Sequence, residues 1–63
     1  MKKVKCSYRA QQVRGSLIYI CRLLDEEARS ETITYEMTGW TKEQALAEMN
    51  KRINYFGYEA EYE

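Results

Sequence analysis

The chain has no histidine, no proline, only three glycines and no long apolar run. Without histidine it lacks the side chain that most often performs acid–base catalysis near neutral pH. The glycines at positions 15, 39 and 57 are too scattered to form a phosphate-binding loop. The only dense carboxylate run, at 25–27, falls in an expected turn, where solvated acids are the ordinary finding. We therefore expect a protein that is not an enzyme and needs no cofactor.

Membrane and metal sites are not expected either. The longest apolar run, LIYIC at 17–21, is far shorter than the roughly 20 residues that cross a bilayer. The first lysines are not followed by an apolar segment, so no signal peptide is visible and a cytoplasmic location is expected. Cys6 and Cys21 alone are too few ligands for a zinc site. We expect both thiols to be reduced and buried, with a disulfide as the alternative if their strands pair.

What the chain does contain fits one small folded domain over residues 1–63. Its 63 residues lie near the lower limit for independent stability. A hydrophobic fraction of 44% and a charged fraction of 32% are typical of a folded domain, not of a disordered tail. Six tyrosines, one tryptophan and one phenylalanine give this short chain large rings to bury.

Charge is unevenly distributed along the chain. Ten basic and ten acidic side chains give a net charge of zero. Residues 1–22 nevertheless contain six of the bases and no acid, whereas residues 23–63 contain all ten acids and four bases. This asymmetry predicts either a charged partner or pairing of the two parts within the molecule.

Residues 2–12 predict a strand with one apolar and one basic face, because apolar and polar positions alternate. The basic face carries Lys3, Lys5 and Arg9. Gly15 supplies the backbone freedom that a hairpin turn needs. The next segment, 16–24, is apolar at both odd and even positions, which predicts a central strand covered on both faces.

The segment 25–30 is polar, and we expect a connection without regular structure there. Residues 31–38 alternate again and predict a third strand. Its inward side chains would be Ile33, Tyr35 and Met37, and its outward ones Thr32, Thr34, Glu36 and Thr38.

A helix is expected over 42–56, because the apolar residues now recur at helical spacing. Thr41 and Gln44 have the spacing of a capping box, which satisfies the first backbone N–H groups of a helix. Gly57 is placed to end the helix. The face expected to pack on the sheet carries Leu46, Met49, Ile53 and Phe56.

The last residues, GYEAEYE at 57–63, alternate once more and predict a short fourth strand, with a frayed tail as the alternative. A right-handed crossover through the helix would place this strand parallel to the first one. Its glutamates would then lie beside Lys3, Lys5 and Arg9 and partly neutralise them. The expected fold is α+β: a three-stranded antiparallel meander followed by one helix (βββα), with a short fourth strand beside strand one.

The segment TGWTKEQALAEMNKRI, residues 38–53, resembles the G-x-T-x-E-E-A-L part of HicB-like antitoxins. This resemblance implies three strands, a helix and a further strand in a partial ribonuclease-H-like arrangement, in a protein that binds a toxin and often dimerises. A looser similarity is to the arm-binding domains of phage integrases, which share the meander and the capped helix. That second similarity implies phosphate contacts for Lys3, Lys5 and Arg9.

Two functions follow from these patterns. The first is a small non-catalytic protein-binding or regulatory module of phage or mobile-element type, because one helix can cover only one face of segment 16–24. A protein partner or a second copy would bind the uncovered apolar side chains. The candidate interface is Ile18, Ile20 and Leu24. If the register is reversed, Leu17 and Leu23 take the place of these residues.

The alternative is a nucleic-acid-binding protein that uses the basic face of the first strand. Tyrosine rings could stack on bases beside it. A pI of about 6.3 and ten acids oppose this function, because neutralising phosphates supplies most of the affinity. The candidate contacts are Lys3, Lys5, Arg9, Arg14 and Arg22.

Overall fold

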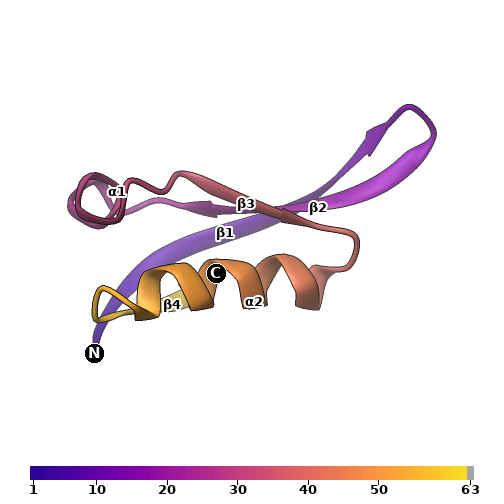
Figure 1. Ribbon diagram of the computed structural model, residues 1–63. Helices are drawn as coiled ribbons and strands as arrows, with labels where there is room; N and C mark the ends of the chain where they lie inside the picture. The colour runs from indigo at the N-terminus through magenta and orange to yellow at the C-terminus, as the bar shows by residue number, and fades with distance from the viewer. Residues whose placement is uncertain (63) are drawn as a thin grey trace.

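A long antiparallel hairpin forms the centre of the sheet in a computed structural model that describes residues 1–62 (Figure 1). Strands β1 (Lys2–Val13) and β2 (Ser16–Leu23) pair from Cys6 opposite Leu23 to Val13 opposite Ser16. The two residues between them, Arg14 and Gly15, have positive φ angles of 50° and 81°. Two positive φ angles define a type I′ turn, whose twist matches that of the strands. The predicted turn at Gly15 is confirmed.

The sheet has four strands in the order β3-β2-β1-β4. Strand β3 (Glu36–Gly39) is antiparallel to β2, and β4 (Tyr58–Tyr62) is parallel to β1. The expected strand beside strand one is therefore confirmed for residues 58–62, and Glu63 lies outside the described residues. The fold is α+β, but it contains two helices, α1 (Glu26–Thr32) and α2 (Lys42–Asn54), where one was expected.

Helix α1 replaces the connection that was expected at 25–30. Asp25 is its N-cap, and its carboxylate accepts a hydrogen bond of 2.9 Å from the backbone N–H of Ala28. Glu26 and Glu27 lie in the first turn, where the helix dipole favours acids. Ala28 and Thr32 are one turn apart and both are fully buried. The run of acids is thus the start of a helix, so the expected turn was wrong, although Glu26 and Glu27 are exposed as expected.

The expected inward and outward faces of 31–38 are reversed at the start of this segment. Ile33 ends α1 in a left-handed conformation and is 78% exposed, and Tyr35 is also exposed. Thr32 and Thr34 are buried because their hydroxyl groups donate to backbone carbonyls, of Ala28 at 2.7 Å and of Thr32 at 3.0 Å. Of the three residues expected to point inward, only Met37 on β3 does so, and it is half-buried.

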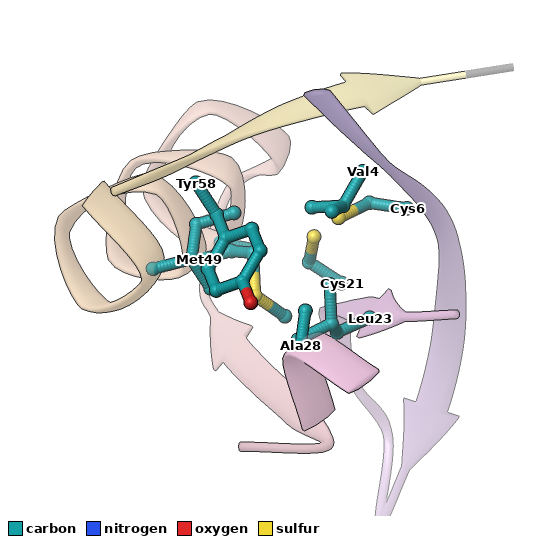
Figure 2. Close-up of a cluster of buried hydrophobic side chains, with 9 residues drawn as sticks. Val4, Cys6, Cys21, Leu23, Ala28, Met49 and Tyr58 are labelled. Carbon is teal, nitrogen blue, oxygen red and sulfur yellow. The ribbon is translucent and has the colours of Figure 1, made fainter. Parts of the chain in front are cut away.

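The core lies between the sheet and α2, and α1 closes one end of it (Figure 2). Met49 and Ile53 on α2 are fully buried, as predicted. They face a layer of strand residues that consists of Val4, Cys6, Cys21, Leu23 and Tyr58. Leu46 is only partly buried. The prediction for Phe56 was wrong, because α2 ends at Asn54 and the ring of Phe56 is 40% exposed beside Tyr55.

Both cysteines are buried as free thiols in this core, on adjacent strands. Figure 2 shows their sulfur atoms pointing toward each other. Hydrogen bonding between the two thiols, together with burial, raises the pKa of Cys6. The Sγ atom of Cys21 also lies 3.7 Å from the hydroxyl oxygen of Tyr62 on β4.

Gly39, the last residue of β3, lies against the first turn of α2. A Cβ atom at this position would be 2.6 Å from the backbone nitrogen of Ala45 and 3.0 Å from the Cβ of Gln44. Backbone atoms of a helix cannot rotate away from such a contact. Glycine therefore permits the close approach that turns the chain from β3 into α2.

The buried face of α2 gives a first prediction. Ile53→Ala should lower the free energy of unfolding by about 2–5 kcal/mol, because it removes buried methyl groups and leaves a cavity. Urea unfolding followed by circular dichroism measures this change. Phe56→Ala is the matched control and should cost far less, since that ring is partly exposed. Equal losses in the two variants would contradict this assignment of the core.

The contact at Gly39 gives a second prediction. Gly39→Ala should cost about 1–3 kcal/mol, because the added methyl group forces β3 and α2 apart. Its exposed neighbour provides the control, since Thr38→Ala should change stability by no more than about 0.5 kcal/mol. A Gly39→Ala variant that unfolds at the same urea concentration as the parent would show that the close approach is absent.

Candidate protein-binding surface

The sheet face opposite α2 carries the basic residues of β1, as the alternation predicted. Strand pairing sets acids of other strands beside them. Lys3 lies opposite Glu59, and Lys5 lies opposite Glu61. Opposite charges across a strand pair are mildly stabilising. The predicted placement of β4 glutamates beside Lys3 and Lys5 is therefore confirmed.

Arg9 is neutralised by a different strand. It lies opposite Ile20 of β2, and its guanidinium reaches past β2 to the carboxylate of Glu36 on β3 at 3.7 Å. Arg22 lies directly opposite the same Glu36. Both side chains of the Arg9–Glu36 pair are about half exposed, so we expect a small energetic contribution. Its main effect is to place an arginine side chain over β2.

This arrangement changes the candidate apolar interface. Ile20 is only 7% exposed, although it lies on the face that α2 does not cover. Ile18 is half-buried, and Leu24 is 38% exposed just beyond the end of β2. The three residues therefore do not form a continuous exposed row. In the other register, Leu23 is fully buried in the core and Leu17 is 52% exposed near the hairpin tip.

A different surface is hollowed and partly apolar. Two shallow hollows, of about 440 and 530 Å³, lie between α2 and the edge strand β3. Met37 and Glu48 line both, so the hollows join into one groove, named here the β3–α2 groove. One end is also lined by Lys51, Arg52, Tyr55 and Phe56, and the other by Ile18, Trp40 and Gln44.

Strand β3 presents an open backbone edge at this groove. It has only one neighbour, β2, in the sheet order. The backbone N–H of Leu23 donates to the carbonyl of Tyr35 at 2.8 Å, and antiparallel pairs alternate in their hydrogen bonding. Residues 35, 37 and 39 therefore face β2, whereas the backbone groups of Glu36 and Thr38 point outward. The next outward N–H, that of Trp40, donates to the side chain of Gln44 at 2.8 Å.

Aromatic side chains stand at both ends of the groove. Trp40 is 69% exposed and Tyr55 is 86% exposed. Arg52 is held at the end near Phe56, because its guanidinium donates to the hydroxyl of Thr34 at 2.9 Å and to the carbonyl of Thr32 at 3.1 Å. The sequence does not predict this surface, because the helical spacing assigns Phe56 to the core and no pattern places Trp40 at an open hollow. Large apolar residues just before and just after the predicted helix were the available signal.

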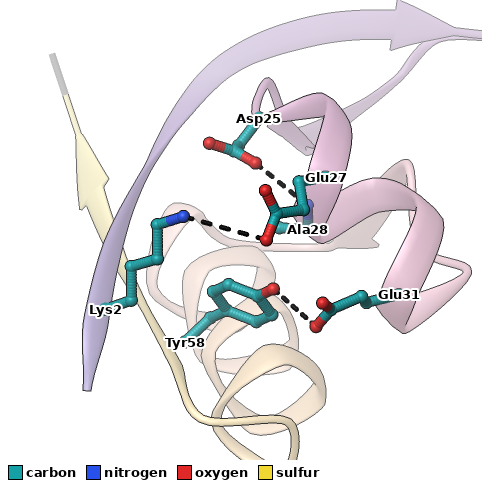
Figure 3. A network of polar contacts seen from close by, with 6 residues as sticks. All are labelled: Lys2, Asp25, Glu27, Ala28, Glu31 and Tyr58. Carbon is teal, nitrogen blue, oxygen red and sulfur yellow. Dashed lines mark hydrogen bonds and ion pairs between the residues drawn. The ribbon is translucent and has the colours of Figure 1, made fainter.

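A polar cluster joins α1 to β1 and β4 (Figure 3). The hydroxyl of Tyr58 on β4 donates to the carboxylate of Glu31 on α1 at 2.5 Å. This hydrogen bond is the largest cause that raises the pKa of Tyr58 to about 12. Lys2 and Glu27 approach to 4.0 Å, but both are well exposed, so this ion pair adds little.

The described residues contain neither a metal-binding cluster nor a membrane-spanning helix. Among residues 1–62, no group of three histidine, cysteine, aspartate or glutamate side chains is placed to hold a metal ion. In the same part of the chain, none of the helices has the length and apolar character needed to span a membrane. No protein-family model matches the chain, and no curated protein or solved structure shows significant similarity to it.

The raised pKa of Tyr58 gives a third prediction. The folded state holds this proton more tightly than the unfolded chain, whose tyrosine pKa is near 10. Stability from this group is therefore fully present below pH 10 and is lost as the pH rises toward 12. Urea unfolding below and above pH 10 should show a smaller alkaline loss in Tyr58→Phe than in the parent protein. Tyr55→Phe is the control, and equal losses in all three proteins would contradict the role of the Tyr58–Glu31 hydrogen bond.

Proposed function

We propose that this protein is a small non-catalytic binding module that recognises another polypeptide through the β3–α2 groove. The observation that carries the proposal is the position of an open strand edge beside exposed apolar side chains. Small folded chains seldom expose several large apolar residues around one hollow unless a partner covers them. A small regulatory protein of phage or mobile-element type would use such a surface to bind its target protein, as the resemblance to toxin-binding HicB-like antitoxins implies.

The groove is better suited to a protein than the interface that the sequence predicted. Ile20 is only 7% exposed on the open face of the sheet, and it lies opposite Arg9, whose guanidinium reaches Glu36. In the groove, Trp40 and Phe56 are exposed at opposite ends and Met37 lies between them. Apolar centres with a polar rim are the usual anatomy of protein interfaces. Aromatic residues contribute most to their affinity.

Nucleic-acid binding is the second candidate, and the shape of the hairpin favours it. β4 pairs only with residues 2–6 of β1, and β3 pairs only with residues 19–22 of β2. The hairpin therefore extends beyond its neighbours and beyond α2 as an arm with Arg14 at its tip (Figure 1). The charge pairing at Lys3, Lys5 and Arg9 opposes it, because those cations already have acidic neighbours.

Capture of partners from a lysate of the source organism tests the proposed function. Immobilised parent protein should retain a protein partner after nuclease treatment, and Trp40→Ser should lose that partner while keeping its melting temperature. Tyr35→Ser is the matched control, because Tyr35 is also exposed but does not line the groove. Equal capture by all three proteins would contradict the proposed surface.

A direct test of the second candidate uses fluorescently labelled DNA and RNA of random sequence. Under the proposed function, binding should be weak, and Arg14→Glu together with Arg22→Glu should change it little. Tight binding that falls steeply with salt and is lost in this double variant would instead establish nucleic-acid binding. That result would contradict the proposed protein-binding function.

A further inference from the structure

Resting on the proposed function, we infer how the partner binds: an extended peptide adds to the free edge of β3 as a fifth strand and sends every second side chain into the β3–α2 groove. Strand addition uses backbone hydrogen bonds for affinity and alternate side chains for specificity. The outward backbone groups of Glu36 and Thr38 supply the two donors and two acceptors that such a strand requires. The groove lies on the side of β3 that faces α2, so alternate partner residues enter it.

The two edges of the sheet differ in how well they can accept a strand. Strand β4 carries two acids along the open face, Glu59 and Glu61, each beside one lysine of β1, and charged side chains along an edge deter pairing with another strand. Strand β3 contains no proline or lysine. Its single acid, Glu36, already faces two arginines, since Arg9 lies 3.7 Å away and Arg22 is directly opposite. The charge of β3 is thus compensated before a partner arrives.

The lining of the groove specifies the chemistry of the partner. Met37 and Trp40 favour apolar side chains at alternate positions of the peptide. Lys51 and Arg52 lie at the end near Phe56, and Arg52 is held there by the hydrogen bonds to Thr34 and Thr32. A carboxylate on the peptide would complement these two cations. We therefore expect a strand with alternating apolar residues and an acidic residue at the end that lies nearest Phe56.

A second copy of this chain fits the same edge less well. Antiparallel pairing of two β3 strands through Glu36 and Thr38 would set Met37 opposite its own equivalent on a twofold axis. Met37 and Glu48 line both hollows, so both lie at the middle of the groove. The two Glu48 carboxylates would then meet near the axis, and like charges in contact oppose association. A peptide with an acid placed only near Lys51 avoids this repulsion.

Selection from a displayed library of random peptides, each about 12 residues long to exceed a typical strand, tests the inference on the full chain. Enriched peptides should alternate apolar residues and carry an acid at one end. Synthetic copies should lose at least tenfold in affinity toward Thr38→Pro, which removes only an outward N–H. Thr38→Val keeps that N–H and should lose far less affinity than Thr38→Pro. Lys51→Glu should weaken acidic peptides and, in a new selection, enrich basic ones.

Amide exchange provides a measurement that does not depend on whether Thr38→Pro folds. In the parent protein, the amide protons of Glu36 and Thr38 should become protected when a selected peptide binds. Peptides that bind without protecting these amides, but lose affinity to Trp40→Ser, would overturn strand addition while leaving the proposed function intact. A selection with no enriched peptide would also overturn strand addition, and capture from the lysate would then decide the proposed function separately.

Discussion

The parallel pairing of β4 with β1 is the constraint on which the rest of this structure depends. This pairing places β4 at the sheet edge opposite β3 and parallel to it, and parallel strands cannot be joined by a tight turn, so the chain must cross the sheet after β3. Helix α2 makes that crossing and brings Met49 and Ile53 over the buried face of the central hairpin. The start of the crossing depends on the close contact between Gly39 and Ala45. One strand pair thus fixes the position of the helix and, through it, the core.

The same pairing decides which surface is left for a partner. Lys3 and Lys5 gain acidic neighbours from β4, and Arg9 turns across β2 toward Glu36. Those pairings contribute little energy, but they give the basic residues acidic neighbours, and Arg9 reaches across β2, where Ile20 is only 7% exposed. The exposed apolar residues that remain include Trp40 and Phe56, which lie at the ends of the β3–α2 groove.

Much of the fold could be predicted from the sequence, because strict alternation and a capping box are local signals. They placed the hairpin with its turn at Gly15, the start of α2 and the tail strand. Helix α1 was missed because its seven residues bury only two side chains, a pattern too short to show helical periodicity. The alternation of 31–38 gave the wrong inward face at the start of this segment. Thr32 and Thr34 are buried because their hydroxyl groups form hydrogen bonds, which a hydropathy pattern does not show. The groove could not be predicted, because its aromatic lining comes from Trp40 before α2 and from Phe56 beyond its end at Asn54, and the helical spacing had assigned Phe56 to the core.

Under the proposed function, the position of the free edge within the topology would keep binding separate from stability in so small a domain. Strands β1 and β2 each have neighbours on both sides, and their side chains make up most of the strand layer of the core. Strand β3 has four residues and contributes only Met37, which is partly buried. Its outer backbone groups take no part in the hydrogen bonding that holds the sheet. A partner strand can therefore add to β3 without displacing any contact of the core, so the free protein is already arranged for binding.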